Sequence, residues 1–165
     1  IQGTVHDPNA ALLGGVAGHA GLFSNSWDLA KLFQMNLQRG FYAERHYLFP
    51  ETVSHFATNY STKSHRGLGW NKPTGKEQSS VALMASSATY GHTGFTGTVV
   101  WVDPTQDLIF IMLSNRVYPT VNNRKLAQLK IRRRMHEAVY NSIIYSWKWV
   151  WKMRIYTLVQ GYFSK

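Results

Sequence analysis

Cysteine is absent from all 165 residues of the sequence, so disulfide bonds and thiolate metal sites are excluded. The histidines do not follow the His-Glu-x-x-His spacing of a zinc-binding helix, and no glycine-rich loop ends in the lysine of a phosphate-binding loop. We therefore expect neither a metal ion nor another cofactor.

Acidic residues are scarce, and their distribution is uneven. Residues 1–123 contain eight Lys or Arg against seven Asp or Glu, a net charge of +1, whereas residues 124–165 contain ten against Glu137 alone, a net charge of +9. The first segment has no basic stripe, so we expect no nucleic acid as its partner. Any anionic partner is confined to the second segment.

Apolar residues are plentiful, at 44% hydrophobic and 14% aromatic. This composition predicts a globular protein rather than a disordered one, and 165 residues are enough for one core. The chain begins at Ile1 without a basic-then-apolar leader. We expect a fragment or processed piece of a longer protein.

Two helices are predicted in the first part of the chain. Dense glycine opposes regular helix over residues 1–25. Apolar residues then recur at helical spacing over 27–38, with Ser26 as the expected N-cap. A second helix is expected from Pro50, which suits a first helical position, to about Ala57.

An antiparallel hairpin is predicted further along. The runs Thr96–Val102 and Leu108–Leu113 are rich in β-forming residues, and residues 103–106 between them form a strong turn signal. Tyr90–Thr93 is expected to lead into the first strand.

The remaining elements are less regular. Gly67–Trp70 is expected to be a short strand, and residues 71–88 a surface connection. A helix is expected from Asn123. Its predicted inner face consists of Ala127, Ile131, Met135, Ala138 and Ser142.

The last segment, 144–165, is both basic and aromatic. Its charges interrupt it too often for a membrane span. Three interpretations stay open: an unstructured or mistranslated extension, a segment that contacts membrane surfaces through Trp, Tyr and basic residues, and a nucleic-acid-binding segment.

The most informative stretch is Tyr90–Thr98, which contains His92, Thr93 and Gly94 and runs into an alternating apolar segment. Small residues beside a strand allow backbone N–H groups to face a cleft, because glycine permits close approach. Penicillin-recognising serine hydrolases use such a strand edge, usually as Lys-Thr-Gly.

Together with this stretch, several others resemble, in order, the C-terminal half of the beta-lactamase-related serine hydrolases, the class C and penicillin-binding-protein-like group. The resemblance covers about residues 1–143. The other stretches are Val5–Ala10, Gly14–Ser24, Asp28–Lys31, Gly67–Trp70, Trp101–Pro104 and Leu113–Arg116. Asn115–Pro119 and Asn122–Leu126 look closest to a subset in which this domain follows a glycoside hydrolase family three domain on one bacterial envelope polypeptide.

The resemblance implies an α+β fold, namely part of a beta-lactamase/transpeptidase-like domain with an antiparallel sheet, flanking helices and a missing N-terminal part. Residues 1–143 would form the C-terminal portion of that domain, and 144–165 a separate tail. The implied location is the cell envelope or periplasm. The implied partners are the missing N-terminal half and a small-molecule acyl substrate.

The resemblance also implies the site residues. The backbone N–H of Phe95 would stabilise an oxyanion, and the Thr93 hydroxyl would bind substrate beside Gly94. His92 stands where the family usually has lysine. A histidine is mostly neutral at pH 7, whereas a lysine is a permanent cation, which predicts a weaker preference for anionic substrates.

Each of these functional assignments has a purely structural alternative. The glycines after His92 would relieve crowding in a strand and do nothing more. His19 would line the substrate site, or would be a structural histidine held by backbone groups.

The nucleophile motif Ser-x-x-Lys occurs nowhere in the sequence. We therefore expect the isolated chain to be inactive, and a complete protein to act through an acyl-enzyme on ester or amide substrates. The competing interpretation is a non-catalytic interaction module that reuses the fold.

Overall fold

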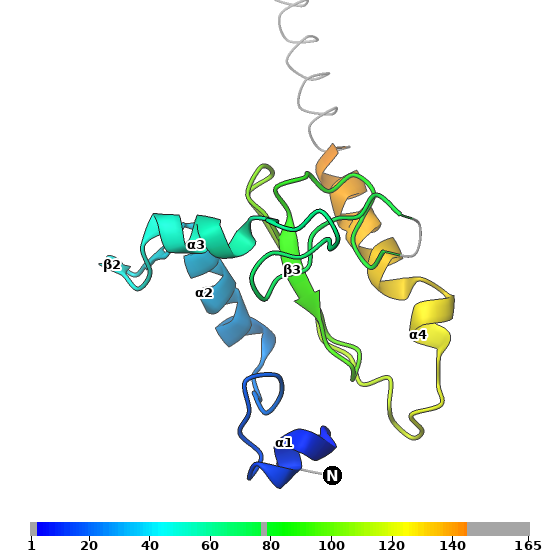
Figure 1. Ribbon diagram of the computed structural model, residues 1–165. Coiled ribbons are helices and arrows are strands. Elements are labelled where there is room, and N and C mark those ends of the chain that lie inside the picture. The colour runs from blue at the N-terminus through cyan, green and yellow to red at the C-terminus, as the bar shows by residue number, and fades with distance from the viewer. Residues whose placement is uncertain (1–2, 77–78, 145–165) are drawn as a thin grey trace, which may run out of the picture.

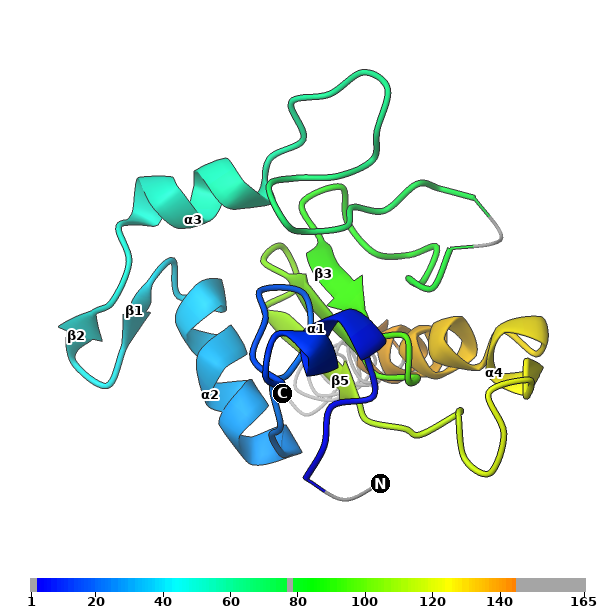
Figure 2. The ribbon, with the colours of Figure 1, turned by 60° about the horizontal axis from the view of Figure 1, so that its bottom comes forward.

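The computed structural model describes residues 3–76 and 79–144. A central antiparallel sheet separates two groups of helices, with α2 (Ser26–Leu37) and α3 (Pro50–Ala57) on one side and a helix over residues 131–144 on the other (Figures 1 and 2). The expected α+β class is therefore confirmed.

The sheet contains β3 (Tyr90–Thr93), β4 (Val99–Asp103) and β5 (Leu108–Met112) in that order. The predicted hairpin around residues 103–106 is confirmed, with Val99 opposite Met112. Tyr90–Thr93 is a strand of its own that pairs with β4, because the chain reverses over residues 94–98 instead of continuing straight.

Both faces of this sheet are buried. Val99 and Trp101 pack on one face with Val139 of the last helix, while alternate residues on the other face pack against α2. Phe33 of α2 forms the centre of the second cluster with Tyr90. The alternation of a strand explains the division, because successive side chains point to opposite faces.

The first helices differ from expectation mainly at their ends. Asn25, not Ser26, is the N-cap of α2, since its side-chain oxygen accepts from the Asp28 backbone N–H at 3.1 Å. The α3 helix begins at Pro50 as predicted. A short helix, α1 (Pro8–Leu12), also forms within the glycine-rich segment, where none was expected. Asp7 caps it.

Between α2 and α3 lies a small hairpin of β1 (Phe41–Tyr42) and β2 (Arg45–His46). The short strand expected at Gly67–Trp70 is absent; an isolated bridge joins Arg66 and Asn71 on either side of it. Gly67 and Gly69 have no side chains that could pack across a pair of strands, which accounts for the missing strand.

Residues 71–88 are not simply a surface connection. Val81 and Ala82 are almost fully buried beneath the last helix, at 2% and 1% exposure. The backbone N–H of Ala82 donates to Nδ1 of His136 at 3.1 Å. This segment therefore forms part of the core.

The C-terminal helical region consists of α4 (Lys125–Gln128) and the helix over 131–144, separated at Lys130, which has a left-handed φ of 50°. The predicted inner face is wrong, because Met135 is 47% exposed and Ala138 is also exposed. The inner face instead carries Arg132, His136 and Tyr140. Their spacing of four residues places them on one side of the helix.

Asp103, at the end of β4, fixes this helix to the sheet. Its carboxylate accepts from the Ser86 hydroxyl at 2.6 Å, from the Thr105 N–H at 3.0 Å and from the Tyr140 hydroxyl. Burial would raise the pKa of the Asp103 carboxyl, but these hydrogen bonds outweigh it and hold the pKa below its ordinary value. A residue predicted only as part of a turn is thus a buried anchor, at 1% exposure.

Apolar side chains stand exposed near the N-terminal end of the described residues. Leu12, Val16, Leu22 and Trp27 are each about four-fifths exposed, at 86%, 83%, 80% and 79%. An exposed apolar group of this kind is typical of a surface that another element covers.

Within residues 3–76 and 79–144, no helix has the length and apolarity needed to cross a membrane. The tail over 145–165 lies outside the described residues, so its three interpretations and the domain boundary at 143 stay predictions.

The burial of His136 predicts a pH-dependent stability. Burial lowers the pKa of this imidazole to about 4 from an unfolded value of 6.5. As pH falls from 6.5 towards 4 the unfolded chain binds a proton that the folded chain does not, so the free energy of unfolding should fall, by up to about 3 kcal/mol. Urea unfolding at a series of pH values measures this loss.

The matched control is His136→Asn, which keeps an acceptor for the Ala82 N–H but does not titrate. Its unfolding free energy should be nearly constant over the same pH range. An equal pH dependence in both proteins would contradict the role given to His136.

Candidate functional site

The turn between β3 and β4 is built by glycines. The Gly94 N–H donates to Thr98 O at 2.8 Å, and the Gly97 N–H donates to Gly94 O at 3.2 Å. Gly97 has φ +124°, and a β-carbon there would collide with Ser114. Only glycine fits such a backbone without strain.

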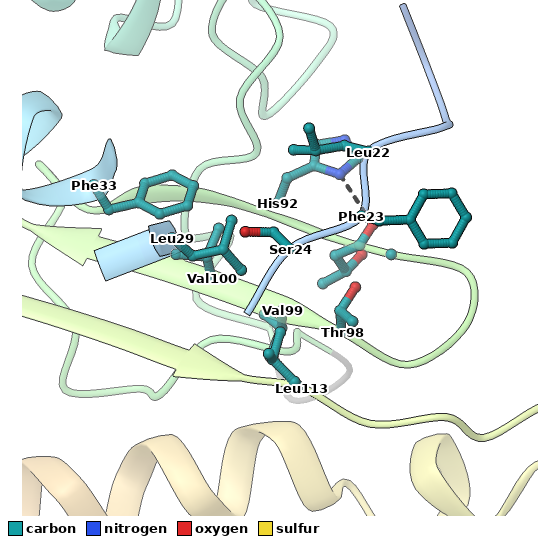
Figure 3. Close-up of a pocket in the computed structure, with 12 residues that line it drawn as sticks. Leu22, Phe23, Ser24, Leu29, Phe33, His92, Thr98, Val99, Val100 and Leu113 are labelled. Carbon is teal, nitrogen blue, oxygen red and sulfur yellow. Dashed lines mark hydrogen bonds between the residues drawn. The ribbon is translucent and has the colours of Figure 1, made fainter. Parts of the chain in front are cut away.

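A hollow of about 410 Å³ lies beside this turn on the α2 side of the sheet. His92, Thr93 and Gly94 contribute to its wall. Figure 3 labels His92 among the side chains that line this hollow. Its other lining residues come from α2, from the segment before it and from the strand ends: Leu22, Phe23, Ser24, Leu29, Phe33, Thr98, Val99, Val100 and Leu113.

His92 points its side chain into this hollow. It pairs with Val100 across the sheet, so both side chains lie on the face covered by α2. Its Nδ1 donates to Thr93 O at 2.9 Å (Figure 3). In the neutral ring that bond leaves Nε2 as an acceptor towards the hollow.

Phe95 follows β3 after one intervening residue, Gly94, and its backbone N–H has no hydrogen-bond partner within the described part of the chain. Gly91 directs its N–H to Asn71, away from β4, whereas Gly94 directs its N–H across the turn to Thr98 O. The N–H shares a trans peptide group with the Gly94 carbonyl, which accepts from Arg132 Nη2 on the last helix, so the N–H points away from that helix. Phe95 does not itself line the hollow, but its neighbour Gly94 does.

Thr93 lies between two hollows. It lines the one beside α2 and also a second of about 550 Å³, whose wall includes Phe95 and three arginines, Arg116, Arg124 and Arg132. Because Thr93 pairs with Val99, its side chain alternates away from that of His92. The candidate hydroxyl therefore lies at the border of the two spaces.

His19 is not among the residues that line either hollow. Its Nε2 lies 3.0 Å from Asp7 Oδ1, and the same oxygen accepts from the Ala10 N–H at 2.9 Å. The bond from Ala10, followed by the contact with His19, lowers the pKa of the partly exposed Asp7 carboxyl. His19 thus pairs with a carboxylate that caps a helix, not with backbone groups as its structural interpretation expected.

Three neighbours of the turn were not found from the sequence. His6 stacks on the Phe95 ring at 5.6 Å between centroids, and the Arg116 guanidinium lies 4.4 Å from the centre of the same ring. Arg132 reaches the turn from the last helix, with Nε 3.0 Å from Gly97 O. Burial, then the nearby Arg116 charge, lowers the pKa of Arg132.

Only the four-residue spacing of Arg132 with His136 and Tyr140 could have suggested its inward direction. In the described ranges, 3–76 and 79–144, no group of three or more His, Asp or Glu side chains could hold a metal ion.

Sequence comparison places these features in a known context. The family described as Beta-lactamase matches residues 2–133. A protein of Escherichia coli K12 named "Putative D-alanyl-D-alanine carboxypeptidase" is 42% identical over 123 residues, which are 73% of this chain and 28% of the relative. A Salmonella enteritidis protein of the same name is 38% identical over 128 residues, 76% of this chain and 30% of the relative.

The chain therefore spans less than a third of the length of these relatives. Among solved structures, a beta-lactamase from Mycobacterium bovis is similar with a TM-score of 0.48 and 23% identity, over 67% of this chain and 46% of that one.

The geometry of the turn predicts that Gly97→Ala destabilises the protein by about 2–4 kcal/mol, because the new β-carbon meets Ser114 in addition to the unfavourable φ. The control is Gly69→Ala, where φ is also positive, +86°, but nothing lies within 4 Å. That variant should lose only about 1 kcal/mol in urea unfolding. Equal losses would mean that the close approach to Ser114 does not matter.

Proposed function

The chain belongs to the beta-lactamase family, and from that membership we propose that it is the C-terminal part of a serine hydrolase that acts through an acyl-enzyme. The supporting observation is the Phe95 N–H, in the turn after β3, which has no hydrogen-bond partner among the described residues. It adjoins Gly94, which lines the hollow together with His92 and Thr93.

The proposed chemistry needs two N–H donors and a nucleophile. The lysine of Ser-x-x-Lys takes the serine proton as the serine oxygen attacks the substrate carbonyl carbon, and the carbonyl oxygen gains negative charge. Collapse of this intermediate expels the leaving group, which takes up that proton, and leaves an acyl-enzyme that water hydrolyses. The Phe95 N–H donates to the developing oxyanion, and a donor of this kind contributes about 3–4 kcal/mol. The second donor is the N–H of the serine itself.

The serine and its lysine belong, in this proposal, to a preceding half of the domain, because Ser-x-x-Lys does not occur in the sequence. Two observations support such a half. The exposed apolar side chains near α1 and α2 need a cover, and β5 has no strand beside it on its outer edge within the described residues. The relatives are more than three times as long as the matched segment.

The substrate proposal rests on His92. A lysine in its place would carry a permanent charge that attracts a substrate carboxylate, whereas the imidazole, whose Nδ1 donates to Thr93 O, presents Nε2 instead. Esters and uncharged acyl groups therefore fit this hollow better than anionic beta-lactams or peptides with a free carboxylate. The names of the relatives favour peptide substrates, which makes a peptidoglycan-like peptide the second candidate.

The wider setting is also proposed. The family resemblance favours a location in the cell envelope or periplasm. Asn115–Pro119 and Asn122–Leu126 favour fusion to a glycoside hydrolase family three domain. The coding sequence upstream of Ile1 tests both the fusion and the Ser-x-x-Lys motif, and its translation without either would contradict this arrangement.

Substrate preference provides one test. In a complete domain that carries a Ser-x-x-Lys half, the unmodified protein should cleave an activated ester faster than benzylpenicillin. His92→Lys should raise kcat/KM for benzylpenicillin relative to the ester by about 10-fold, the equivalent of one charge-assisted hydrogen bond.

The control is His46→Lys, the same change on β2, outside both hollows. It should leave the ratio unchanged. Faster cleavage of penicillin than of ester by the unmodified protein would contradict the assignment of His92.

Covalent labelling tests the division of the catalytic groups. An activated-ester probe for serine nucleophiles should label the complete domain once and should leave the 165-residue chain unlabelled, because the chain lacks the serine-lysine pair. Mass spectrometry of the intact proteins measures the added acyl mass. Label on the isolated chain would refute this division, and an unlabelled complete domain would favour a non-catalytic module.

A further inference from the structure

We propose that Arg132 is a positioning residue that fixes the peptide between Gly94 and Phe95, and so aims the Phe95 N–H at the reacting oxygen. This inference rests on the proposed function and adds a residue to it from outside the hollow. Arg132 lies on the last helix, on the opposite side of the sheet from α2 (Figure 2).

The first observation is how Arg132 holds the turn. Its Nη2 donates to Gly94 O at 2.8 Å, and its Nε donates to Gly97 O at 3.0 Å. One guanidinium thus binds the carbonyls of the first and last residues of the segment 94–97. A planar fork with fixed donors suits this task, and a lysine ammonium does not, because it is a single flexible point charge.

The second observation is that every carbonyl of the turn is held. Besides the two bonds from Arg132, the Arg116 Nε donates to Phe95 O at 2.7 Å and the Arg116 backbone N–H donates to Thr96 O at 2.8 Å. Bound carbonyls on all four residues restrict the rotation of each peptide plane. The Phe95 N–H lies in a turn whose carbonyls are all bonded, and like the Thr96 N–H it has no hydrogen-bond partner among the described residues.

The third observation concerns direction. The Gly94 carbonyl and the Phe95 N–H belong to one peptide group, which is trans. In a trans peptide the two groups point in opposite directions. A cation that binds the carbonyl therefore turns the N–H away from the last helix, and also polarises the peptide so that the N–H becomes a stronger donor.

The helix that carries Arg132 is itself firmly placed. His136 and Tyr140, one and two turns further along, bond to Ala82 and Asp103. A residue on this face, four positions before His136, has its direction set by those bonds. The arginine is thus pre-organised before any substrate arrives.

The test uses the complete domain that carries a Ser-x-x-Lys half, with an activated ester as substrate. Arg132→Met keeps most of the side-chain volume but removes both donors. It should lower kcat by about 10- to 100-fold and change KM by less than about 3-fold, because the aim of the N–H matters mainly in the transition state. Arg132→Lys should recover only part of the loss.

Arg134→Met is the matched control, because Arg134 is exposed on the same helix and the variant makes the same change in charge. It should leave kcat unchanged. A normal kcat in Arg132→Met, or an equal loss in Arg134→Met, would overturn the proposal.

Amide hydrogen exchange of Gly94 and Gly97, whose N–H groups are bonded within the turn, separates this inference from the proposed function, since it needs no activity. Exchange should be at least about 10-fold faster in Arg132→Met than in the unmodified protein, and unchanged in Arg134→Met. If the unmodified domain is inactive but exchange accelerates, the hydrolase proposal fails and the structural hold on the turn stands. If exchange does not accelerate, Arg132 does not fix the turn, and the inference is wrong.

Discussion

The buried carboxylate of Asp103 is the interaction on which the arrangement depends. It sits at the end of β4 and receives hydrogen bonds from the segment at Ser86, from the turn at Thr105 and from Tyr140 of the last helix. A buried charge is tolerated only when hydrogen bonds replace its lost water, and here several donors do so. The helix is consequently held in one rotational position.

That rotational position determines what happens at the opposite end of the helix. Tyr140 at the carboxylate and His136 at Ala82 place Arg132 beneath the turn that follows β3. The conformation of this turn determines which backbone groups of the candidate site have hydrogen-bond partners and which do not. Packing on one face of the sheet is thereby linked to the chemistry proposed on the other face.

The molecule carries surfaces that its own described residues do not cover. The exposed apolar side chains of residues 12–27, the outer edge of β5 and the outward face of Met135 are of this kind. A sheet edge and apolar patches together favour association with further chain. They agree with a family relationship in which the matched segment is less than a third of each relative.

Local patterns were sufficient for the elements that depend on neighbouring residues. The hairpin at residues 103–106 and the start of α3 at Pro50 follow from turn residues and backbone restriction, which act over a few positions. The N-cap of α2 was missed by one residue, because Asn25 and Ser26 can both cap and only the realised bond distinguishes them.

The face of the last helix was predicted wrongly for a different reason. Apolar periodicity favoured the side with Met135 and Ala138, but the buried side carries Arg132, His136 and Tyr140. Polar side chains can be buried when they find partners, and their partners here lie 35 to 54 positions away in the sequence. Periodicity contains no information about such distant partners.

The sequence by itself determined the family resemblance, the α+β class and the position of the histidine-threonine-glycine triplet, because these depend on residue order and local backbone preference. Only the tertiary structure decided that His19 pairs with Asp7, that His92 faces the hollow and that the Phe95 N–H is left open. Those facts depend on which distant groups meet across the sheet, and hydrogen bonds between distant groups exist only once the chain has folded.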